Sequence, residues 1–215
     1  MTQYPQTLFV TGIGTDIGKS YATAWLALEI MKTGESVTTQ KFIQTGCHEF
    51  SEDIATHRRL MGIEPTPEDQ MHITAPIIFS YPASPHLAAA LDSRTLDLTL
   101  ATEATKVLAA KYDHVLIEGA GGIMVPLEGD YLTIDYIAER KLPAVVVTTG
   151  QLGSISTTLL TLRAIRDYGI ELFALVYNPH FDSDSIICGD TRHYLRGWLG
   201  RHFPDARYLE MPTSF

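Results

Sequence analysis

Cysteine is the first residue type that is scarce in this 215-residue chain, since it occurs only twice. Cys47 and Cys188 lie far apart in the sequence and match neither a metal-binding nor a redox-active spacing. The eight histidines likewise lack the H-x-x-x-H spacing of a metal site. We therefore expect two free thiols in a reducing compartment and no metal held by cysteine or histidine.

Positive charge is scarce as well. The chain has 16 lysines and arginines against 25 aspartates and glutamates, which gives a formal net charge of −9. Nucleic-acid grooves and anionic membrane surfaces reward clustered basic residues, but here these residues are scattered apart from the pair Arg58 and Arg59. The composition argues against a nucleic-acid or membrane partner.

Long apolar runs are also missing. No stretch approaches the roughly 18 apolar residues that read as a membrane-spanning helix. Residues 1–5 carry neither the basic region nor the apolar segment of a secretory signal. We expect a soluble, cytoplasmic protein.

Two common catalytic or cofactor motifs are absent. No G-x-S-x-G elbow occurs, so a serine hydrolase of that type is excluded. Gly12 and Gly14 continue to Gly18 rather than to a third glycine at position 17, as a dinucleotide-binding turn would require. The chain therefore favours a triphosphate over a dinucleotide.

Short β-branched runs alternate with longer helical patterns along the whole chain, which is typical of parallel strands joined by crossover helices. The predicted strands are 7–11, 36–41, 113–118, 144–149 and 172–177. The predicted helices are 19–33, 52–61, 98–111, 131–140, 154–168 and 184–201. We predict one domain over residues 1–215, with an α/β fold of three layers (α/β/α) and a mostly parallel central sheet, of the P-loop NTPase type.

A glycine-rich turn, residues 12–20, lies between the first predicted strand and the first predicted helix. Its backbone N–H groups, the positive end of the helix dipole and the Lys19 cation make a phosphate cradle, and the Ser20 hydroxyl is placed to bind Mg²⁺. The usual P-loop pattern puts a glycine six residues before the lysine, where this chain has Ile13. The turn still predicts a nucleotide triphosphate site.

Charged residues follow two other predicted strands, at the edge where parallel sheets bind ligands. Lys41 would add a second cation to the phosphate cleft, and Glu118 occupies the Walker B position for holding Mg²⁺. Asp53 lies in the first turn of a predicted helix, where the helix dipole alone explains an acid. A further glycine-rich turn at residues 150–156 opens a helix and is a second candidate anion site.

Residues 65–85 carry five prolines and little periodicity. We expect a long surface excursion there, with one strand at 77–81, and functional importance is common in such excursions. Residues 82–90 predict a loop that turns into an apolar helix.

Five sequence blocks, in order along residues 7–178, match one known enzyme family. Residues 12–20 are similar to its G-T-G-T-D-x-G-K-T loop, including the displaced glycine. Residues 41–46 are similar to K-P-x-Q-T-G, except that Phe42 replaces the usual proline. Its S-P-H, E-G-A-G-G and L-G-x-I-x blocks correspond to residues 84–86, 118–122 and 152–156. The chain thus resembles the dethiobiotin synthetases.

The resemblance implies ATP-dependent carboxylation and ring closure of 7,8-diaminopelargonate with CO₂, which gives dethiobiotin, ADP and phosphate in biotin biosynthesis. It implies Mg²⁺ as cofactor and a homodimer with the site at the subunit interface. In that family the turn matched by residues 152–156 comes from the opposite subunit and receives the carboxylate tail of the substrate.

The resemblance also assigns roles to individual residues. The implied nucleotide-binding residues are Gly14, Thr15, Asp16, Ile17, Gly18, Lys19, Ser20, Glu118 and, at the base, Asn178. The implied Mg²⁺ ligands are Ser20, Asp53 and Glu118. The implied catalytic residues are Thr15, Lys19 and Lys41. The implied substrate-binding residues are Lys41, Thr45, Ser84, Gly153, Ser154 and Ile155, with His86 expected nearby.

Two other functions share the predicted fold. A partition or septum-positioning ATPase carries a signature lysine five residues before the loop lysine, where this chain has Gly14. A synthetase of the cobyric-acid type needs a glutamine-hydrolysing cysteine triad, for which neither Cys47 nor Cys188 has suitable neighbours. The last residues, 208–215, depart from the family's G-E-I-P turn, so selectivity among ATP, CTP and GTP stays open.

Overall fold

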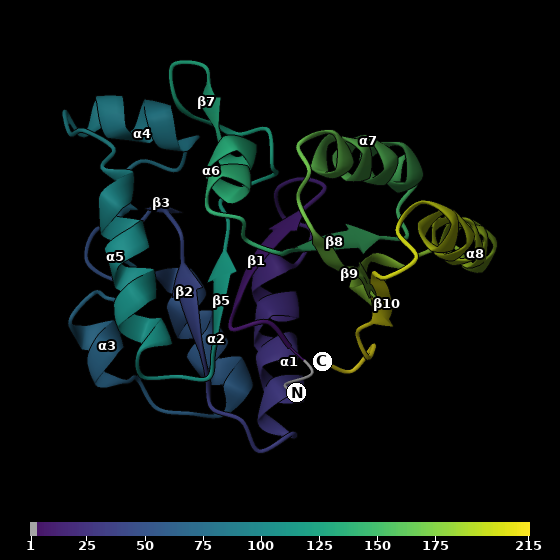
Figure 1. Ribbon diagram of the computed structural model, residues 1–215, viewed down its shortest axis with the longest axis horizontal. Coiled ribbons are helices and arrows are strands. Elements are labelled where there is room, and N and C mark those ends of the chain that lie inside the picture. Colours follow the sequence, from purple (N-terminus) through teal and green to yellow (C-terminus); the bar gives the residue numbers. More distant parts are fainter. Residues whose placement is uncertain (1–3) are drawn as a thin grey trace.

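The centre of the fold is a six-stranded sheet, seen in a computed structural model that describes residues 4–215 (Figure 1). Its strands are β1 (Thr7–Gly12), β2 (Val37–Lys41), β5 (His114–Glu118), β8 (Ala144–Thr149), β9 (Leu172–Asn178) and β10 (Arg207–Glu210). Their spatial order is β10, β9, β8, β1, β5, β2, and all neighbours are parallel. The predicted parallel sheet is confirmed.

Helices make the connections between these strands. The α-helices are α1 (Lys19–Met31), α2 (Glu52–Met61), α3 (Pro67–Gln70), α4 (Pro85–Leu91), α5 (Leu98–Ala109), α6 (Thr133–Glu139), α7 (Ser154–Asp167) and α8 (Ser185–His202), and η1 (Pro179–Phe181) is a 3₁₀ helix. Within residues 4–215, no helix combines the length and the apolar character that crossing a bilayer requires.

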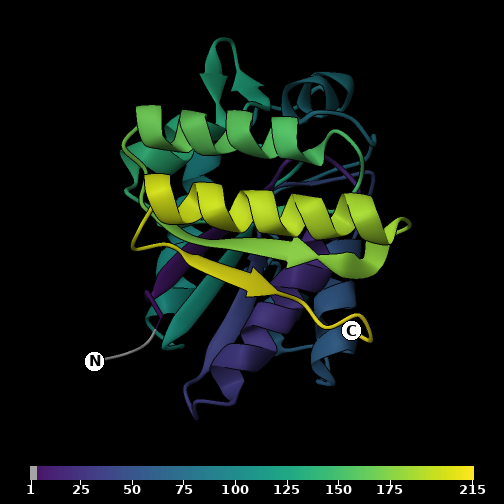
Figure 2. The same ribbon diagram turned by 90° about the vertical axis from the view of Figure 1, so that its right-hand side faces the viewer.

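Different helices cover the two faces of the sheet, because successive strand residues point to opposite faces. On β1, Leu8 and Val10 belong to an apolar cluster that also contains Leu26 and Ile30 of α1. Phe9, between them, belongs to the cluster that contains residues of α5, α6, α7 and α8. Figure 2 shows α7 and α8 side by side over β9 and β10. The predicted three-layer arrangement is therefore confirmed.

Four short strands lie outside the central sheet. β3 (Gln44–Thr45) pairs in parallel with β4 (Ile78–Phe79), and β6 (Pro126–Glu128) pairs antiparallel with β7 (Tyr131–Leu132). The predicted strand over residues 77–81 is thus reduced to β4. The helix predicted over residues 131–140 is wrong at its start, because its first two residues form β7 and α6 begins later.

The edge strand β10 has no counterpart among the predicted strands. It is only four residues long, and its residues are half-buried or exposed rather than enclosed. Short edge strands lack the buried apolar run that identifies central strands. These residues form a strand because they pair with β9, which the local sequence does not indicate.

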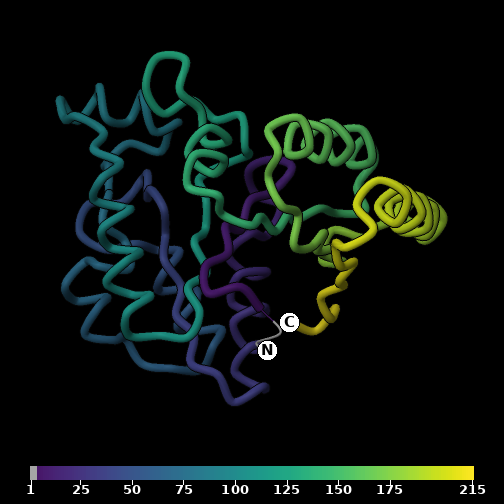
Figure 3. Tube along the Cα trace, viewed as in Figure 1, coloured from purple at the N-terminus to yellow at the C-terminus, as the bar shows by residue number. Residues whose placement is uncertain are grey.

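The predicted excursion at residues 65–85 runs beside the end of β2 (Figure 3). The backbone N–H of Lys41 donates to the Thr74 carbonyl at 2.7 Å, and that of Gln44 donates to the Ile77 carbonyl at 2.9 Å. These bonds hold the loop after β2 against the excursion. The excursion then leads into α4, which begins where an apolar helix is predicted.

The position of β1 in the sheet determines where a ligand can bind. β5 and β2 lie on one side of β1, and β8, β9 and β10 lie on the other. Open parallel sheets bind ligands at the carboxyl ends of the strands at such a switch point. The glycine-rich turn that leaves β1 lies at this place.

Candidate functional site

A cavity of about 860 Å³ opens beside the glycine-rich turn. Of the residues implied by the family resemblance, it is lined by Thr15, Asp16, Gly18, Lys19, Ser20, Lys41, Thr45, Asp53, Ser84, Glu118 and Asn178. These come from six separate stretches of the chain. Gly14, Ile17, Gly153, Ser154, Ile155 and His86 do not line it, and His86 is exposed.

The glycine-rich turn ends at Gly18, the N-cap of α1. Gly18 has φ +83°, and a Cβ there would lie 2.2 Å from the Asn178 Nδ2 atom, so both conformation and space demand glycine. No side chain caps the first turn of α1. Its free N–H groups are therefore directed to the cavity as a helix N-terminus suited to phosphate.

Lys19 lies folded back onto this turn, with its Nζ atom donating to the Gly14 carbonyl at 2.8 Å. Burial and the neighbouring Lys41 cation lower the pKa of Lys19 to about 8. Two lysines near one cavity repel each other unless an anion lies between them. The arrangement suits a ligand with several negative charges.

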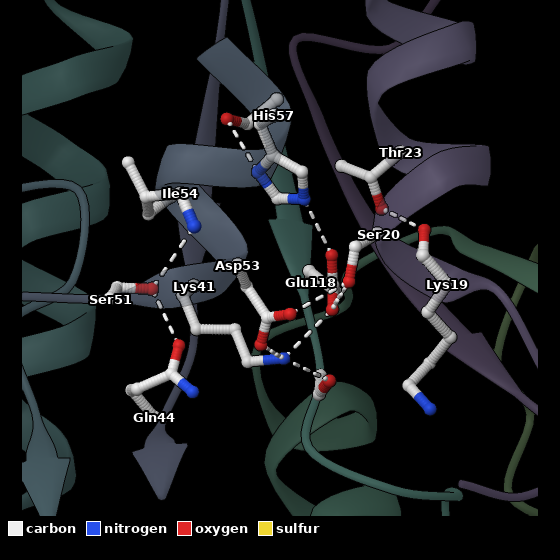
Figure 4. A network of polar contacts seen from close by, with 12 residues as sticks. Lys19, Ser20, Thr23, Lys41, Gln44, Ser51, Asp53, Ile54, His57 and Glu118 are labelled. Carbon is white, nitrogen blue, oxygen red and sulfur yellow. Dashed lines mark hydrogen bonds and ion pairs between the residues drawn. The ribbon is translucent and has the colours of Figure 1, made fainter. Parts of the chain in front are cut away.

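Lys41, at the end of β2, sits between two carboxylates (Figure 4). Its Nζ atom is 2.5 Å from Asp53 Oδ2 and 2.8 Å from Glu118 Oε1. The Ser20 Oγ atom lies 2.8 Å from Asp53 Oδ1 and 3.0 Å from Glu118 Oε1. Four polar groups from β2, α2, β5 and α1 thus converge on one point.

The charges of this group reinforce one another. Burial alone would lower the pKa of Lys41, but the Glu118 and Asp53 carboxylates outweigh burial and raise it above its usual value. Burial alone would raise the pKa of Glu118, but Lys41 and a hydrogen bond from His57 hold it well below its usual range. Lys41 and Glu118 are both charged at neutral pH.

The donor set fits a divalent cation with a preference for oxygen. Ser20, Asp53 and Glu118 present one hydroxyl and two carboxylates, which are the ligand types that Mg²⁺ prefers. The two carboxylates already attract the Lys41 cation between them. No group of three or more Asp, Glu, His or Cys residues within 4–215 could hold a metal alone. Mg²⁺ commonly completes its coordination with phosphate oxygens and water.

α2 carries two site residues on one face, because Asp53 and His57 are four positions apart. The Ser51 side chain caps this helix by accepting from the Ile54 N–H at 3.1 Å. The same Ser51 hydroxyl donates to Gln44 Oε1 at 2.6 Å. The start of α2 is thereby tied to β3, the short strand that follows Lys41 and carries Gln44 and Thr45 (Figure 4).

His57 is a site residue that the sequence analysis missed. Its Nε2 atom lies 2.7 Å from Glu118 Oε2, and the side chain is fully buried. The only local signal is its spacing of four residues from Asp53 on a predicted helix. That spacing places the two side chains on one face but does not show what the face meets.

Phe42, which stands where the family usually has proline, has a structural role of its own. Its backbone N–H donates to the Glu118 carbonyl at 2.8 Å, a bond that proline cannot make. Its ring is fully buried against Phe9 and Tyr136, with centroids 5.5 Å and 4.4 Å away. The departure therefore fastens the end of β2 to Glu118 instead of loosening it.

Asn178, the last residue of β9, lines the cavity beside the glycine-rich turn. Its Nδ2 atom donates to the Ile17 carbonyl at 3.0 Å, and its Oδ1 atom accepts from the His180 N–H at 3.0 Å. The amide thus joins the glycine-rich turn to η1 and keeps one N–H and one lone pair for a further partner. Residues Phe181 and Met211 line the cavity beside it.

The N-terminus of α7 forms a separate candidate anion site. Gly153 is its N-cap with φ +96°, and no side chain caps the first turn. The Ser154 Oγ atom is buried and has no hydrogen-bond partner among residues 4–215. An uncapped helix N-terminus with an unpaired hydroxyl suits a carboxylate or phosphate.

The chain is similar in sequence to a family of domains and to several named enzymes. Residues 6–196 match the family described as AAA domain. The chain is 45% identical to the ATP-dependent dethiobiotin synthetase BioD 2 of Pasteurella multocida (strain Pm70), over 96% of the chain and 97% of the relative. It is 47% identical to the ATP-dependent dethiobiotin synthetase BioD 2 of Haemophilus ducreyi (strain 35000HP / ATCC 700724), over 95% of the chain and 97% of the relative. It is 42% identical to the ATP-dependent dethiobiotin synthetase BioD of Chlorobaculum tepidum, over 97% of the chain and 88% of the relative.

Among solved structures, the chain is similar to pNOB8 ParA bound to nonspecific DNA. The TM-score is 0.55 with 13% identity, and the match covers 96% of this chain and 80% of that one. At this identity the likeness concerns the fold, which is that of a P-loop NTPase.

Proposed function

The chain belongs to the dethiobiotin synthetase family, and we propose that it closes the ureido ring of dethiobiotin from 7,8-diaminopelargonate, CO₂ and ATP. The observation that carries this proposal is the placement of Lys19 and Lys41 on one cavity with Ser20, Asp53 and Glu118. The substrates are metabolites of the cell interior, so we place the enzyme in the cytoplasm.

The proposed reaction has three steps. One amine of the diamine adds to CO₂ to form a carbamate and releases a proton. A carbamate oxygen then attacks the γ-phosphorus of ATP, and ADP leaves. The second amine attacks the carbonyl carbon of the mixed anhydride, so that phosphate leaves with loss of a second proton and the ring closes.

The chain's cationic residues suit this chemistry. Phosphoryl transfer through a loose transition state needs positioning and positive charge rather than a protein nucleophile. Lys19 lies at the phosphate cradle and Lys41 lines the same cavity as Thr45, so we assign both lysines to the carbamate and the transferring phosphoryl group. Thr15 lines the cavity near them, and we assign it to the same region.

The nucleotide is assigned to the N-terminus of α1 and to Asn178 at the end of β9. The N–H groups of the turn from Gly14 to Ser20 would receive the phosphates, with Asp16 beside them. The free N–H and lone pair of the Asn178 amide would read the base. Turnover measured with ATP, CTP and GTP in parallel tests this assignment.

We assign Mg²⁺ to Ser20, Asp53 and Glu118, where it would neutralise charge on the phosphates of ATP. Lys41 lies between the same two carboxylates, so its cation is held next to the residues that would bind the ion.

The diamine is assigned to the part of the cavity lined by Lys41, Thr45 and Ser84. Its carboxylate tail would bind at Gly153, Ser154 and Ile155 of a second copy of the chain in a homodimer. Those residues do not line the cavity of their own chain, and the Ser154 hydroxyl is buried without a partner.

Release of phosphate in the presence of ATP, bicarbonate and Mg²⁺ should depend on 7,8-diaminopelargonate. Mass spectrometry of the product should show dethiobiotin. ATP hydrolysis at the same rate with and without the diamine would contradict the proposal, and would favour a nucleotide-dependent switch of the same fold.

The proposed dimer gives a separate prediction at Leu160, a leucine of α7 that is 65% exposed. Leu160→Glu should give a monomer by sedimentation, because a charge would be placed in an apolar contact. The KM for the diamine should rise about 10- to 100-fold, since hydrogen bonds to a charged group contribute about 1.5–3 kcal/mol. Leu100→Glu, at an exposed leucine of α5, is the matched control and should behave as wild type. A dimeric Leu160→Glu variant would count against this interface.

A further inference from the structure

His57 is a buried histidine that does not itself line the cavity but contacts Glu118, which does. The side chain is 0% exposed, and each of its two ring nitrogens has a hydrogen-bond partner within the protein. Nε2 lies 2.7 Å from Glu118 Oε2, and Nδ1 lies 2.9 Å from the Thr39 hydroxyl on β2. The imidazole therefore bridges β2 and β5, and Figure 4 shows its contact with Glu118.

The direction of these hydrogen bonds follows first from Glu118, because a charged carboxylate can only accept, so that Nε2 donates. Arg58, the next residue on α2, then contributes at Thr39. An arginine can only donate, and its Nη1 atom lies 2.9 Å from Thr39 Oγ1. Thr39 accepts that bond and directs its own proton to His57 Nδ1 at 2.9 Å. Nδ1 is then an acceptor, and Nε2 carries the proton that is donated to Glu118. Asp69 holds the guanidinium with two bonds, at 2.8 Å and 2.9 Å.

The bond from His57 gives the two carboxylate oxygens of Glu118 different partners. Oε2 is occupied by His57, whereas Oε1 faces Ser20 and Lys41. The Glu118 carbonyl is held as well, by the N–H of Phe42 at 2.8 Å. With its backbone and one oxygen fixed, the carboxylate cannot turn Oε1 away from the cavity.

We propose that His57 is a positioning residue, whose Nε2–H group holds Glu118 so that Oε1 is presented to the metal ion, with Thr39 and Arg58 setting the imidazole tautomer. This inference rests on the proposed role of Glu118 as an Mg²⁺ ligand. Groups that orient metal ligands commonly change metal affinity or activity about 10- to 100-fold when they are removed.

The first test measures metal affinity without turnover. Mn²⁺ is titrated into the full chain with saturating ADP and followed by electron paramagnetic resonance. His57→Leu, which has no donor, should bind Mn²⁺ about 10- to 100-fold more weakly. His57→Gln, whose amide N–H can replace Nε2–H, should recover most of the affinity. In turnover, His57→Leu should lower kcat and raise the Mg²⁺ requirement, with the KM for the diamine unchanged.

A matched control separates this effect from the loss of any buried histidine. His114 is also buried, and its Nε2 atom faces the Glu35 carboxylate at 3.2 Å. It lies at the first residue of β5, whereas Glu118 is the last. His114→Leu should leave the Mn²⁺ affinity unchanged. Equal losses in His57→Leu and His114→Leu, or wild-type affinity in a folded His57→Leu, would overturn the proposal.

A second test does not depend on whether His57→Leu folds. The ¹⁵N shifts of the His57 ring in the wild-type chain should show a protonated Nε2 and an unprotonated Nδ1. The opposite tautomer would overturn the proposal. Thr39→Val should weaken Mn²⁺ binding, and Thr39→Ser should not.

These results are independent of the reaction itself. A chain that does not consume the diamine but loses Mn²⁺ affinity in His57→Leu would refute the proposed activity and support the positioning role. A chain that forms dethiobiotin with Mn²⁺ affinity indifferent to His57 would do the reverse.

Discussion

Lys41→Met should lower the rate of ring closure about 100- to 1,000-fold and leave nucleotide affinity within about threefold of wild type. The methionine keeps most of the side-chain volume but removes the cation that Lys41 contributes to the cavity. The transition state then loses a fixed positive charge in a site shielded from water, where such charge is most effective. Phosphate release with the diamine and direct ADP binding measure the two quantities.

Lys19→Met is the comparison for this prediction. Lys19 lies on the glycine-rich turn itself and bonds the Gly14 carbonyl at 2.8 Å, so its loss should weaken nucleotide binding as well as turnover. If both variants lost nucleotide affinity to the same extent, the separate roles assigned to the two lysines would be wrong.

Asp69→Ala should reduce the free energy of unfolding by about 3–5 kcal/mol, because it leaves Arg58 buried without its partner. Arg58 is 3% exposed, and Asp69 holds it with two hydrogen bonds. Asp69 also bonds the Thr66 N–H at 2.7 Å and the Thr74 hydroxyl at 2.6 Å. Urea unfolding of the variant measures the loss.

The pH dependence of this contribution has a definite sign. Burial alone would raise the pKa of Asp69, but its bonds from Arg58 and Thr74 outweigh burial and lower it. A carboxyl with a lowered pKa in the folded state stabilises above its unfolded value, near pH 4, and loses this contribution as pH falls through the folded value. Wild type and Asp69→Ala should therefore converge in stability in strong acid.

A surface ion pair provides the control. Asp167 is 69% exposed and lies 3.7 Å from Arg166, so Asp167→Ala should cost less than about 1 kcal/mol. The double variant Arg58→Leu/Asp69→Ala should be more stable than Asp69→Ala, since no unpaired charge remains buried. An Asp69→Ala variant as stable as Asp167→Ala would contradict the prediction.

The central strands could be predicted because each is a short, buried, β-branched run that lies between segments with helical periodicity. β10 could not, since an edge strand of four partly exposed residues has no such run. The start of α6 was misplaced because Tyr131 and Leu132 suit either helix or strand, and their pairing with β6 decided between them.

The candidate site divides in the same way. The glycine-rich turn could be recognised from the sequence, because its nine residues are adjacent and their spacing alone predicts a phosphate cradle. The sequence did not indicate that Gly14 and Ile17 would lie outside the lining of the cavity. Lys41 and Glu118 could be assigned to the same edge of the sheet because parallel strands end together. Asp53 could not be distinguished from an ordinary first-turn acid without the family resemblance.

For this protein, the sequence by itself determined the α/β class, the phosphate cradle and the strand ends at which charged residues gather. Each of these is set by residues that are neighbours along the chain. Only the tertiary structure decided that Lys41 lies between Asp53 and Glu118, that His57 holds the second oxygen of Glu118, and that the Phe42 N–H holds its carbonyl. These contacts join β2, α2 and β5, and such contacts depend on packing between distant segments, which no local pattern records.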